Sequence, residues 1–452
     1  MTRRWALSMA SFLSACGVHP QDESPTTTPT LPALSTAGPV VPGAYGYGME
    51  TRAAYACGTD PAILRVTNLD DSGEGSLRAA LEADGPRVVV FEISGTIVLG
   101  SAIYIAHPCL TVAGQTAPAP GISVRGGAED AMIEIDTHDV LMQHFRARAS
   151  GGSDICTSAL GAWDERGYGF GERPYNVVFD HMSVSWGQDE GMYFSADNVT
   201  VWRSIMSEGL FQVPGSEGCG GGGLSNGHGL LVAGYAQNVA VVESVFAHNA
   251  ARNPEIHGGT TTLVVNNVMY DFANANNEPA GTLFYAPDPS PFNAAIIGNT
   301  YVNGPTSATD KYAVAVWSGE PGSVLYLADN AVDGAMPYGN YLDFDPLVAA
   351  PSLDLPEGIA PMASADVEAT VLPRAGARPI DRDAVDTRVI LDVYNRTGSR
   401  ITDPAEVGGW PELAVVQRAF ETPDDPHAIS ATGYTNLEDT LHAYARELEG
   451  GE

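Results

Sequence analysis

Basic residues are scarce in this chain of 452 residues. Lys and Arg together number 22 against 55 Asp and Glu, which gives a formal net charge of −33. A face rich in positive charge is therefore not expected, and nucleic acid is not expected as a partner. Charged residues make up only 17% of the chain and hydrophobic residues 44%, so the composition predicts a large core and not general disorder.

The first apolar run, Trp5 to Leu13, is too short to span a membrane. It follows Arg3 and Arg4, a pattern typical of a signal peptide. The next residues, Leu13 to Cys16, resemble the bacterial lipobox, in which cleavage before the Cys is followed by its lipidation. We therefore predict a signal peptide over residues 1–15 and a lipid on Cys16. The alternative is an ordinary signal peptide with a chance Cys.

Residues 16–42 are rich in Thr, Pro and Ser, which predicts a flexible tether between the lipid and a folded domain. The protein is then exported and held at the cell envelope or surface, with the lipid as its only contact with a membrane. If the lipid is missing, the same signals predict a secreted protein.

Cysteine is also rare, with five residues in the chain and no CxxC spacing, so a Cys-ligated zinc site is not expected. If Cys16 carries a lipid, four cysteines remain, and export permits disulfides between them. Four cysteines allow three pairings, and the sequence leaves the choice open. The four are Cys57, Cys109, Cys156 and Cys219.

Amphipathic helical stretches do not separate the β-rich runs that begin at Val88, which argues against alternating strands and helices. Gly, Asn and Asp punctuate these runs instead. The runs are Val88–Ile93, Leu110–Val112, Val177–Phe179, Val199–Val201, Val239–Val242, Leu263–Val265, Ala295–Ile297 and Val324–Leu327.

The runs align with one another. Asn-Val opens three of them, at Asn176, Asn198 and Asn238, and an equivalent position six residues later continues along the chain. A base period of about 22 residues with variable insertions is typical of a solenoid with one rung per turn. We therefore predict an all-β, parallel β-helix in which small polar side chains stack as a ladder; the alternative is a β-sandwich with uneven loops. The ladder positions are Met182, Ser204, Ser244, Asn267, Asn299 and Asn330.

The longest insertion lies between Ser204 and Ser244 and contains Gly218–Gly223 and Gly227–Gly229. A solenoid places such loops on chosen faces, so this segment is either a plain surface loop or a rim that contacts a ligand.

The repeated β-rich runs end at about Asp345. We predict the β-helix over residues 43–345 and a C-terminal extension over 346–452 that packs on its side. The extension looks irregular up to about Trp410 and ends in a short helix over Thr435–Leu448, since Thr435 and Glu438 form a capping box. We expect a monomer.

Several ordered motifs point to a family. Together they resemble the bacterial pectate-lyase-like proteins, a family of right-handed parallel β-helix polysaccharide lyases, over roughly residues 44 to 440. The motifs are Val66–Arg78, Phe91–Ile97, Ala113–Pro118, Phe179–His181 with Ser183–Gly187, Phe246–Asn249 with Arg252–Pro254, Gly376–Pro379 with Arg382–Asp386, and Gly408–Pro411.

The resemblance implies β-elimination on an acidic, uronate-containing polysaccharide. In the family an arginine of an Arg-x-Pro motif removes the C5 proton, calcium and basic side chains neutralise the uronate carboxylate, and the 4-linked oxygen leaves. The matching residue here is Arg252. Since calcium takes several oxygen ligands, Asp189, Glu190 and Asp154 are the expected metal ligands. Arginine is normally always protonated, so alkaline activity is expected.

The sequence also departs from the family pattern. Ser158 stands where an Asp is expected, and Glu255 and His257 occupy places that hold basic residues in the family. Glu255 is expected to pair with Arg252 and keep it protonated. The upstream catalytic lysine has no lysine counterpart, and His228 is the nearest candidate. We expect His228, His257 and Glu255 to contact the substrate.

Two other functions fit parts of the sequence. A glycoside hydrolase on the same fold is suggested by Gly227–Gly229, but it needs two carboxylates that flank the bond, and Asp189 and Glu190 are adjacent. A cell-surface glycan-binding protein without catalysis is suggested by Ser158 and Glu255. For His181 and His248, which lie in predicted rungs, a structural role is favoured.

Overall fold

Short strands dominate the computed structural model, which describes residues 38–126, 131–149, 157–163, 173–211, 226–273, 279–287 and 289–451. The predicted signal peptide, Cys16, and all but the last residues of the tether lie outside this described part. Within the described residues, no helix has the length and apolar character needed to cross a membrane.

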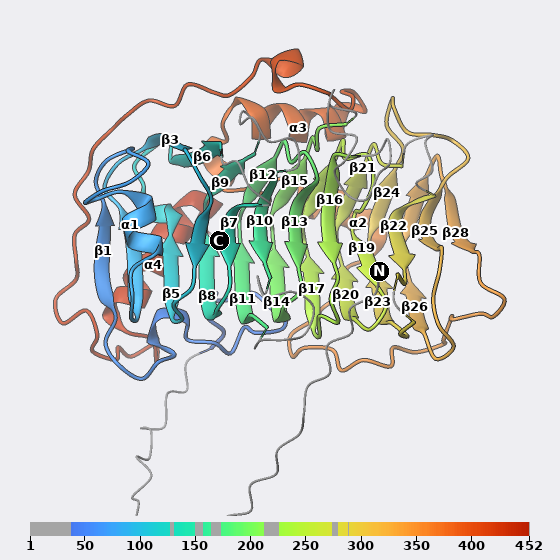
Figure 1. Cartoon of the computed structure of the whole chain (residues 1–452), viewed down its shortest axis with the longest axis horizontal. Helices are drawn as coiled ribbons and strands as arrows, with labels where there is room; N and C mark the ends of the chain where they lie inside the picture. Colours follow the sequence, from blue (N-terminus) through green and yellow to red (C-terminus); the bar gives the residue numbers. More distant parts are fainter. Residues whose placement is uncertain are drawn as a thin grey trace, which may run out of the picture. The chain divides into compact units, whose positions relative to one another are not determined.

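The strands form three parallel sheets that the chain visits in turn (Figure 1). The first sheet contains β1 (Ala62–Val66), β2 (Arg87–Phe91), β5 (Leu110–Ala113), β8 (His138–Gln143), β11 (Tyr175–Asp180), β14 (Asp197–Trp202), β17 (Val239–Val242), β20 (Thr261–Val265), β23 (Asn293–Ile297) and β26 (Val324–Ala328). The second contains β4 (Ile103–Ile105), β7 (Ala131–Ile135), β10 (Ser158–Ala162), β13 (Glu190–Phe194), β16 (His228–Val232), β19 (Glu255–His257), β22 (Ala280–Tyr285), β25 (Tyr312–Val316) and β28 (Met336–Asn340). The third contains β3 (Gly95–Leu99), β6 (Ile122–Gly126), β9 (Arg146–Arg148), β12 (Ser183–Ser185), β15 (Ile205–Ser207), β18 (Val245–Ala247), β21 (Val268–Tyr270), β24 (Thr300–Val302) and β27 (Ala331–Asp333).

From β2 onward, every third strand returns to the same sheet and pairs in parallel with its predecessor, as β8, β11 and β14 do. This is a right-handed parallel β-helix, the hand that connections between parallel strands adopt. The predicted fold class is confirmed. The β-sandwich alternative is wrong, because a sandwich pairs its strands in antiparallel fashion.

The predicted ladder of small polar side chains is present. Ser244 donates its backbone N–H to Asn267 Oδ1 at 2.8 Å, and Asn267 donates its own to Asn299 Oδ1 at 2.9 Å. Asn299 in turn donates to Asn330 Oδ1 at 3.0 Å. Each rung therefore satisfies buried backbone groups of the rung before it, which is why Ser and Asn recur there.

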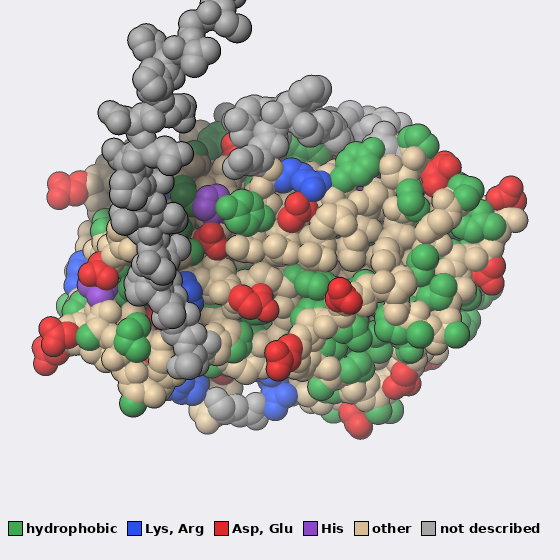
Figure 2. All heavy atoms as spheres, turned by 90° about the horizontal axis from the view of Figure 1, so that it is seen from below, with side chains coloured by type: hydrophobic (Ala, Val, Ile, Leu, Met, Phe, Trp, Pro, Cys, Tyr) green, Lys and Arg blue, Asp and Glu red, His purple; other side chains and the backbone are tan. Residues whose placement is uncertain are grey.

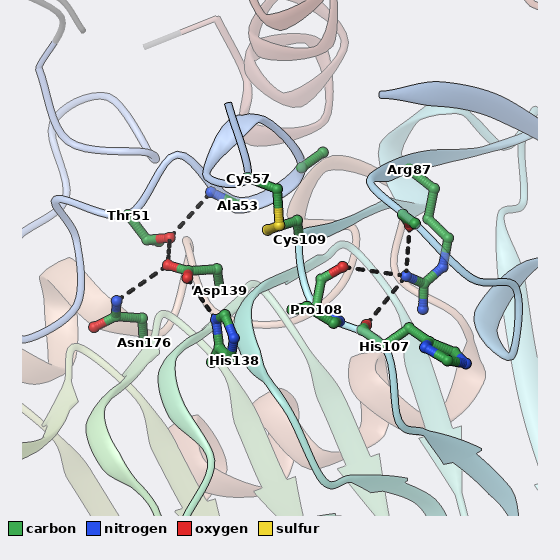
Figure 3. Close-up of a disulfide and its surroundings, with 12 residues drawn as sticks. Thr51, Ala53, Cys57, Arg87, His107, Pro108, Cys109, His138, Asp139 and Asn176 are labelled. Carbon is green, nitrogen blue, oxygen red and sulfur yellow. Dashed lines mark hydrogen bonds and ion pairs between the residues drawn. A yellow bond between two sulfur atoms is a disulfide. The ribbon is translucent and has the colours of Figure 1, made fainter. Parts of the chain in front are cut away.

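The N-terminal residues of the described part cover the outer face of the first sheet. Val40, Val41 and Met49 pack with Trp202 in one apolar cluster. The short helix η1 (Ala53–Tyr55) follows, and the Cys57–Cys109 disulfide then ties this segment to the turn before β5 (Figure 3). This resolves the pairing of two cysteines, while Cys156 and Cys219 lie outside the described residues.

The C-terminal extension is more regular than predicted. It contains α2 (Ser364–Val371), η4 (Pro379–Asp381), α3 (Ala384–Asn395), η5 (Pro404–Val407) and α4 (Asn436–Glu449). The prediction of α4 is confirmed, with both hydrogen bonds of the Thr435–Glu438 capping box. The prediction of irregular chain up to Trp410 is wrong, because α3 begins at an N-cap, Asp383, and buries one face through Val385, Val389 and Val393.

Helices α2 and α3 pack on the outer face of the third sheet, where Val367 and Val389 join Ile205 and Val245 in one cluster (Figure 1). Leu437 of α4 packs with Val88 and Val90 of the first sheet. Two short helices lie nearer the N-terminus. Helix α1 (Leu77–Leu81) inserts Leu77 and Leu81 into the main core, and η2 (Gly114–Thr116) follows β5.

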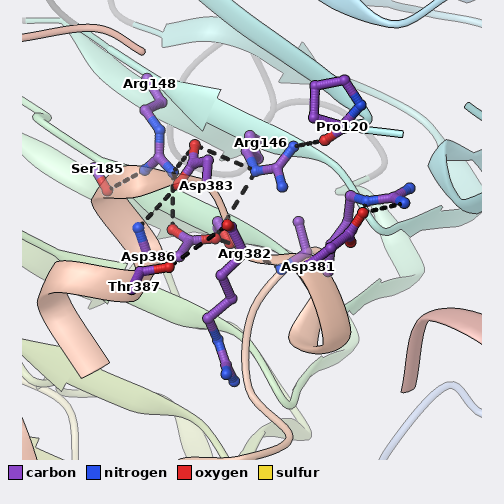
Figure 4. A network of polar contacts seen from close by, with 12 residues as sticks. Pro120, Arg146, Arg148, Ser185, Asp381, Arg382, Asp383, Asp386 and Thr387 are labelled. Carbon is purple, nitrogen blue, oxygen red and sulfur yellow. Dashed lines mark hydrogen bonds and ion pairs between the residues drawn. The ribbon is translucent and has the colours of Figure 1, made fainter. Parts of the chain in front are cut away.

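Buried ion pairs anchor α3 to β9 (Figure 4). Arg148 Nη2 donates to Asp383 Oδ2 and to Asp386 Oδ1, both at 2.8 Å, and Arg146 Nε lies 3.4 Å from Asp383 Oδ2. Ser183 Oγ donates to Asp386 Oδ2 at 2.6 Å. All four charged side chains are almost fully buried.

The outer face of the second sheet differs from the other two. Among the described residues it carries only a small apolar cluster of Ala280, Leu283 and Ala315 beside Tyr312. The charged residues singled out in the sequence lie instead on or beside β13, β16 and β19.

Candidate functional site

Successive rungs bring the predicted site residues together at the start of three strands of the second sheet. Glu190 opens β13 and is in register with His228, which opens β16. Ala251, next to Arg252, bridges to His228, and Glu255 opens β19. The predicted ligand Asp154 lies outside the described residues.

Arg252 connects the rungs. It has a left-handed backbone, with φ of 57°, directly before the cis Asn253–Pro254 bond. Its Nη1 forms an ion pair with Glu190 Oε1, and its Nε lies 3.3 Å from Glu255 Oε2. Glu190 opens β13, Arg252 lies just before β19, and the long arginine side chain spans the rungs between them. The expected pairing of Glu255 with Arg252 is present.

Asp189, Glu190 and His228 form the second part of the site. Ligand atoms of these three residues lie within 4.8 Å of one another. His228 Nδ1 is 3.5 Å from Asp189 Oδ1 and 3.9 Å from Glu190 Oε1. Adjacent residues of a strand point to opposite faces, but Asp189 lies in a bend before β13, so this alternation does not separate it from Glu190.

Burial sets the ionisation of the carboxylates. It raises the pKa of Glu190 to about 7; Asp189 and Glu255 add to the rise, and Arg252 opposes it. Burial also acts to raise the pKa of Glu255, but Arg252 and His257 hold that pKa down to about 2. In the same way His228 and Arg252 outweigh burial and lower the pKa of Asp189. A further cation beside Glu190 would favour its ionised form.

Two contacts complete the polar shell. His257 Nε2 lies 2.8 Å from Glu255 Oε1, which orients the imidazole. Ser158, noticed in the sequence only as the place of a missing Asp, lies in the rung before Glu190, and Glu190 donates its backbone N–H to Ser158 Oγ at 3.3 Å. The hydroxyl thus stands where a carboxylate would have added a further negative charge.

The donor set bears on metal binding. Asp189 and Glu190 offer carboxylate oxygens, the ligand type that calcium takes, and Asp189 Oδ1 is buried without a hydrogen-bond partner. His228 offers nitrogen, which suits transition metals better than calcium. The two carboxylates therefore fit as part of a calcium site that needs further oxygens from substrate or water.

A second group of potential ligands has a structural explanation. His144, Asp180 and His181 lie close together, but His181 Nδ1 is 2.6 Å from Asp180 Oδ1 and His144 Nδ1 is 2.9 Å from the Ala377 carbonyl. The two imidazole rings stack in parallel, with centroids 4.9 Å apart. His248 is likewise buried, with Nδ1 2.9 Å from Asp271 Oδ2. The structural interpretation of His181 and His248 is supported by these contacts.

The chain has clear relatives among characterised families. It is 30% identical over 385 residues to a probable pectate lyase C of Neosartorya fischeri, which covers 83% of this chain and 82% of the relative. It is 29% identical over 430 residues to the probable pectate lyase C of Aspergillus flavus, which covers 88% and 92%. These relatives are fungal, so the comparison supports the predicted family but not its description as bacterial. No protein-family model matches the chain.

Solved structures with a similar backbone include the cedar-pollen allergen jun a 1, at 14% identity and a TM-score of 0.49, covering 72% of this chain and 90% of the allergen. A mutant pectate lyase of Bacillus subtilis matches at 12% identity and a TM-score of 0.47, covering 74% and 96%. The extent and identity of the curated relatives, together with the β-helix, show that the chain belongs to the pectate lyase family.

Proposed function

We propose that the protein is a lyase that cleaves a uronate-containing polysaccharide of the pectate type by β-elimination. The observation that carries the proposal is the Arg252 guanidinium, which lies against Glu190 and Glu255 on the outer side of the second sheet. Family membership supports the reaction class, and the relatives reported above are named as probable pectate lyases.

Arg252 is the proposed base that takes the C5 proton. Glu190 and Glu255, which contact it, favour its protonated form. The ion pairs must therefore weaken and the guanidinium must first lose a proton to solvent, after which the neutral guanidine can accept the C5 proton. High pH and the engagement of Glu190 by a cation both act in that direction. The proposal therefore includes alkaline activity.

Asp189 and Glu190 are the proposed calcium ligands, with Asp154 as a third. When bound, calcium neutralises the uronate carboxylate and makes the C5 proton more acidic. The protein itself supplies little positive charge: Figure 2 shows scattered acidic side chains and few basic ones on one face, in keeping with the net charge of −33. A polyanion would otherwise be repelled.

The remaining predicted residues take different roles in this proposal. His257, whose side chain is 17% exposed, is available to a substrate, and Glu255 orients it. His228 is 1% exposed, which supports a role in positioning Asp189 and Glu190. Glu255 acts on Arg252 through its ion pair.

The test is the formation of unsaturated product, followed by its absorbance, on polygalacturonate with and without calcium. Product should form with calcium and disappear in an Asp189→Ala/Glu190→Ala variant that still shows the circular dichroism of a β-helix. The matched control is Asp424→Ala/Asp425→Ala, an exposed adjacent acidic pair far along the chain. Equal calcium dependence in wild type and site variant would remove these ligands from the proposal.

Two outcomes would favour other functions. New reducing ends without unsaturated product indicate a glycoside hydrolase, for which the proximity of Asp189 and Glu190 is not sufficient since two carboxylates must flank the bond. Binding without any turnover indicates a glycan-binding protein.

Export and lipid anchoring through Cys16, in a bacterial envelope, complete the proposal. The Cys57–Cys109 disulfide supports an oxidising compartment. Cys16→Ser should release the protein from membranes, and unchanged retention of that variant would contradict the anchor.

A further inference from the structure

Four consecutive rungs of the second sheet place a ring at the same position. His257 is in register with Tyr285, at the ends of β19 and β22. The register of β22, β25 and β28 aligns Phe284, Val316 and Asn340. The residues that directly follow these three are Tyr285, Trp317 and Tyr341, so they share one position in successive rungs. The backbone continues the pattern, because Trp317 donates its N–H to the Phe284 carbonyl at 2.9 Å and Tyr341 donates to the Val316 carbonyl at 3.0 Å.

Three of the four rings of this row are open to solvent, and the side chain of His257 is 17% exposed. Tyr285 is 38% exposed, Trp317 48% and Tyr341 52%. Of the six exposed large aromatic residues in the described part of the chain, these three share one row, so their exposure is not scattered. The rings also form two contacting pairs: the centroids of Trp317 and Tyr341 are 5.0 Å apart, and those of His257 and Tyr285 are 5.7 Å apart. A grouped aromatic surface of this kind marks a binding site more often than single exposed residues do.

The row continues directly from the candidate site. His257, its first member, contacts Glu255, which contacts Arg252. The following rings advance by one rung each, about 4.8 Å per rung. That step is comparable with one sugar unit, so a polysaccharide that lies at Arg252 and runs along the axis of the β-helix would meet one ring after another.

The charged residues near the row indicate which kind of sugar it would bind. The row contains no arginine or lysine, and the one lysine of the chain, Lys311, precedes Tyr312, whose ring centroid is 6.2 Å from that of Tyr341. Acidic residues flank the row in the sequence at Asp310, Glu320 and Asp343. A polysaccharide with a free carboxylate on every sugar would find little positive charge here to compensate its own negative charge. The apolar face of an uncharged sugar, in contrast, stacks well on an aromatic ring.

We propose that His257, Tyr285, Trp317 and Tyr341 form a sugar-binding platform for an uncharged stretch of polysaccharide, such as methyl-esterified uronate, next to the bond that is cleaved. Only the position of that bond rests on the function proposed above. The platform itself is a binding site and does not require turnover.

The experiment measures dissociation constants of the full chain for two probes, highly methyl-esterified pectin and unesterified polygalacturonate. Trp317→Ala and Tyr341→Ala should each weaken binding of the esterified pectin about tenfold, the loss expected for one stacked aromatic side chain. Trp317→Phe should keep most of the affinity because it keeps a ring. Tyr394→Ala is the matched control, since Tyr394 is 46% exposed but lies on α3.

Thermal unfolding of each variant checks that the fold is intact. The platform is refuted if Trp317→Ala and Tyr341→Ala bind esterified pectin as wild type does, or if the wild type prefers the unesterified chain and the variants lower that preference. Binding is also measured in Arg252→Ala. If wild type makes no unsaturated product but Trp317→Ala still loses binding, the proposed function fails and the platform stands.

Discussion

Two clusters of arginine and carboxylate in this protein differ in charge balance. In the cluster at α3, Arg146 and Arg148 face Asp383 and Asp386, so two positive groups meet two negative ones (Figure 4). In the cluster on the second sheet, as far as the described residues go, Glu190 and Glu255 contact the guanidinium of Arg252, with Asp189, His228 and His257 beside them.

The pKa values report this difference. At α3, Arg148 and Arg146 overcome burial and hold the pKa of Asp383 down to about 2, and the pKa of Arg148 is raised by its two carboxylates. On the second sheet, burial and neighbouring carboxylates raise the pKa of Glu190 to about 7 although Arg252 contacts it. Removing one partner of a buried ion pair is costly, so we expect the balanced cluster to matter for stability. The excess of carboxylate on the second sheet is one basis of the calcium proposal made above.

Replacement of Arg252 should give the largest effect. We expect Arg252→Ala to lower the rate of unsaturated-product formation by about 10²- to 10⁴-fold, the usual contribution of a proton-transfer group. Arg252→Lys should fail nearly as badly, because a lysine loses the planar fork that reaches both carboxylates. Initial rates are compared with Arg203→Lys, whose Nε also pairs with a carboxylate, Glu243, at 2.8 Å. Full activity in Arg252→Ala would end the assignment of this residue as the base.

Disruption of the balanced cluster should affect stability and not chemistry. Asp386→Asn leaves Arg148 and Arg146 with less compensation, and we expect the free energy of unfolding to fall by about 3–5 kcal/mol. The rate per folded molecule should stay unchanged. Asp381→Asn, which breaks a half-exposed pair with Arg378, should cost about 1 kcal/mol or less in the same denaturant titration. A loss of activity per folded molecule in Asp386→Asn would contradict the assignment of the cluster at α3 to stability alone.

A third polar group predicts a pH limit for the fold. Burial acts to lower the pKa of His248, but its hydrogen bond to Asp271 and the nearby carboxylate of Asp392 raise it to about 9, above the 6.5 of an unfolded chain. The protonated form therefore contributes stability that is complete below about pH 6.5 and is lost as pH rises through 9. Between pH 6 and pH 10 the wild type should lose on the order of 2–3 kcal/mol more unfolding free energy than His248→Gln. Equal pH dependence in the two proteins would contradict this.

The smallest effect is expected at Glu255. Glu255→Gln removes one of the two carboxylates that favour protonated Arg252, so the rate should rise a few-fold and the pH profile should shift to lower pH. Glu243→Gln, which removes the partner of Arg203 instead, should leave the profile in place. A profile that moves to higher pH in Glu255→Gln would show that Glu255 assists the base rather than opposing it.

Part of this site was predictable. The ordered motifs pointed to Arg252, Asp189 and Glu190. The ladder from Ser244 to Asn330 follows from the spacing of the β-rich runs, because one residue type recurs at each turn of a solenoid. The contact between Arg252 and Glu190 did not follow, since strand spacing says nothing about the reach of a side chain. Helix α3 was missed although Asp383 and the valines that follow it carry a recognisable helix signal.

The sequence by itself determined the solenoid, its ladder, the final helix and which charged residues are candidates for the site on the second sheet. These features depend on local spacing and on residue type. Only the tertiary structure decided the Cys57–Cys109 pairing, the closure of Arg252 onto Glu190 and the exposed row from His257 to Tyr341. Each of these joins residues whose separation along the chain varies with the loops between rungs. Which of them meet depends on how the rungs stack, and that stacking is set by packing over the whole β-helix.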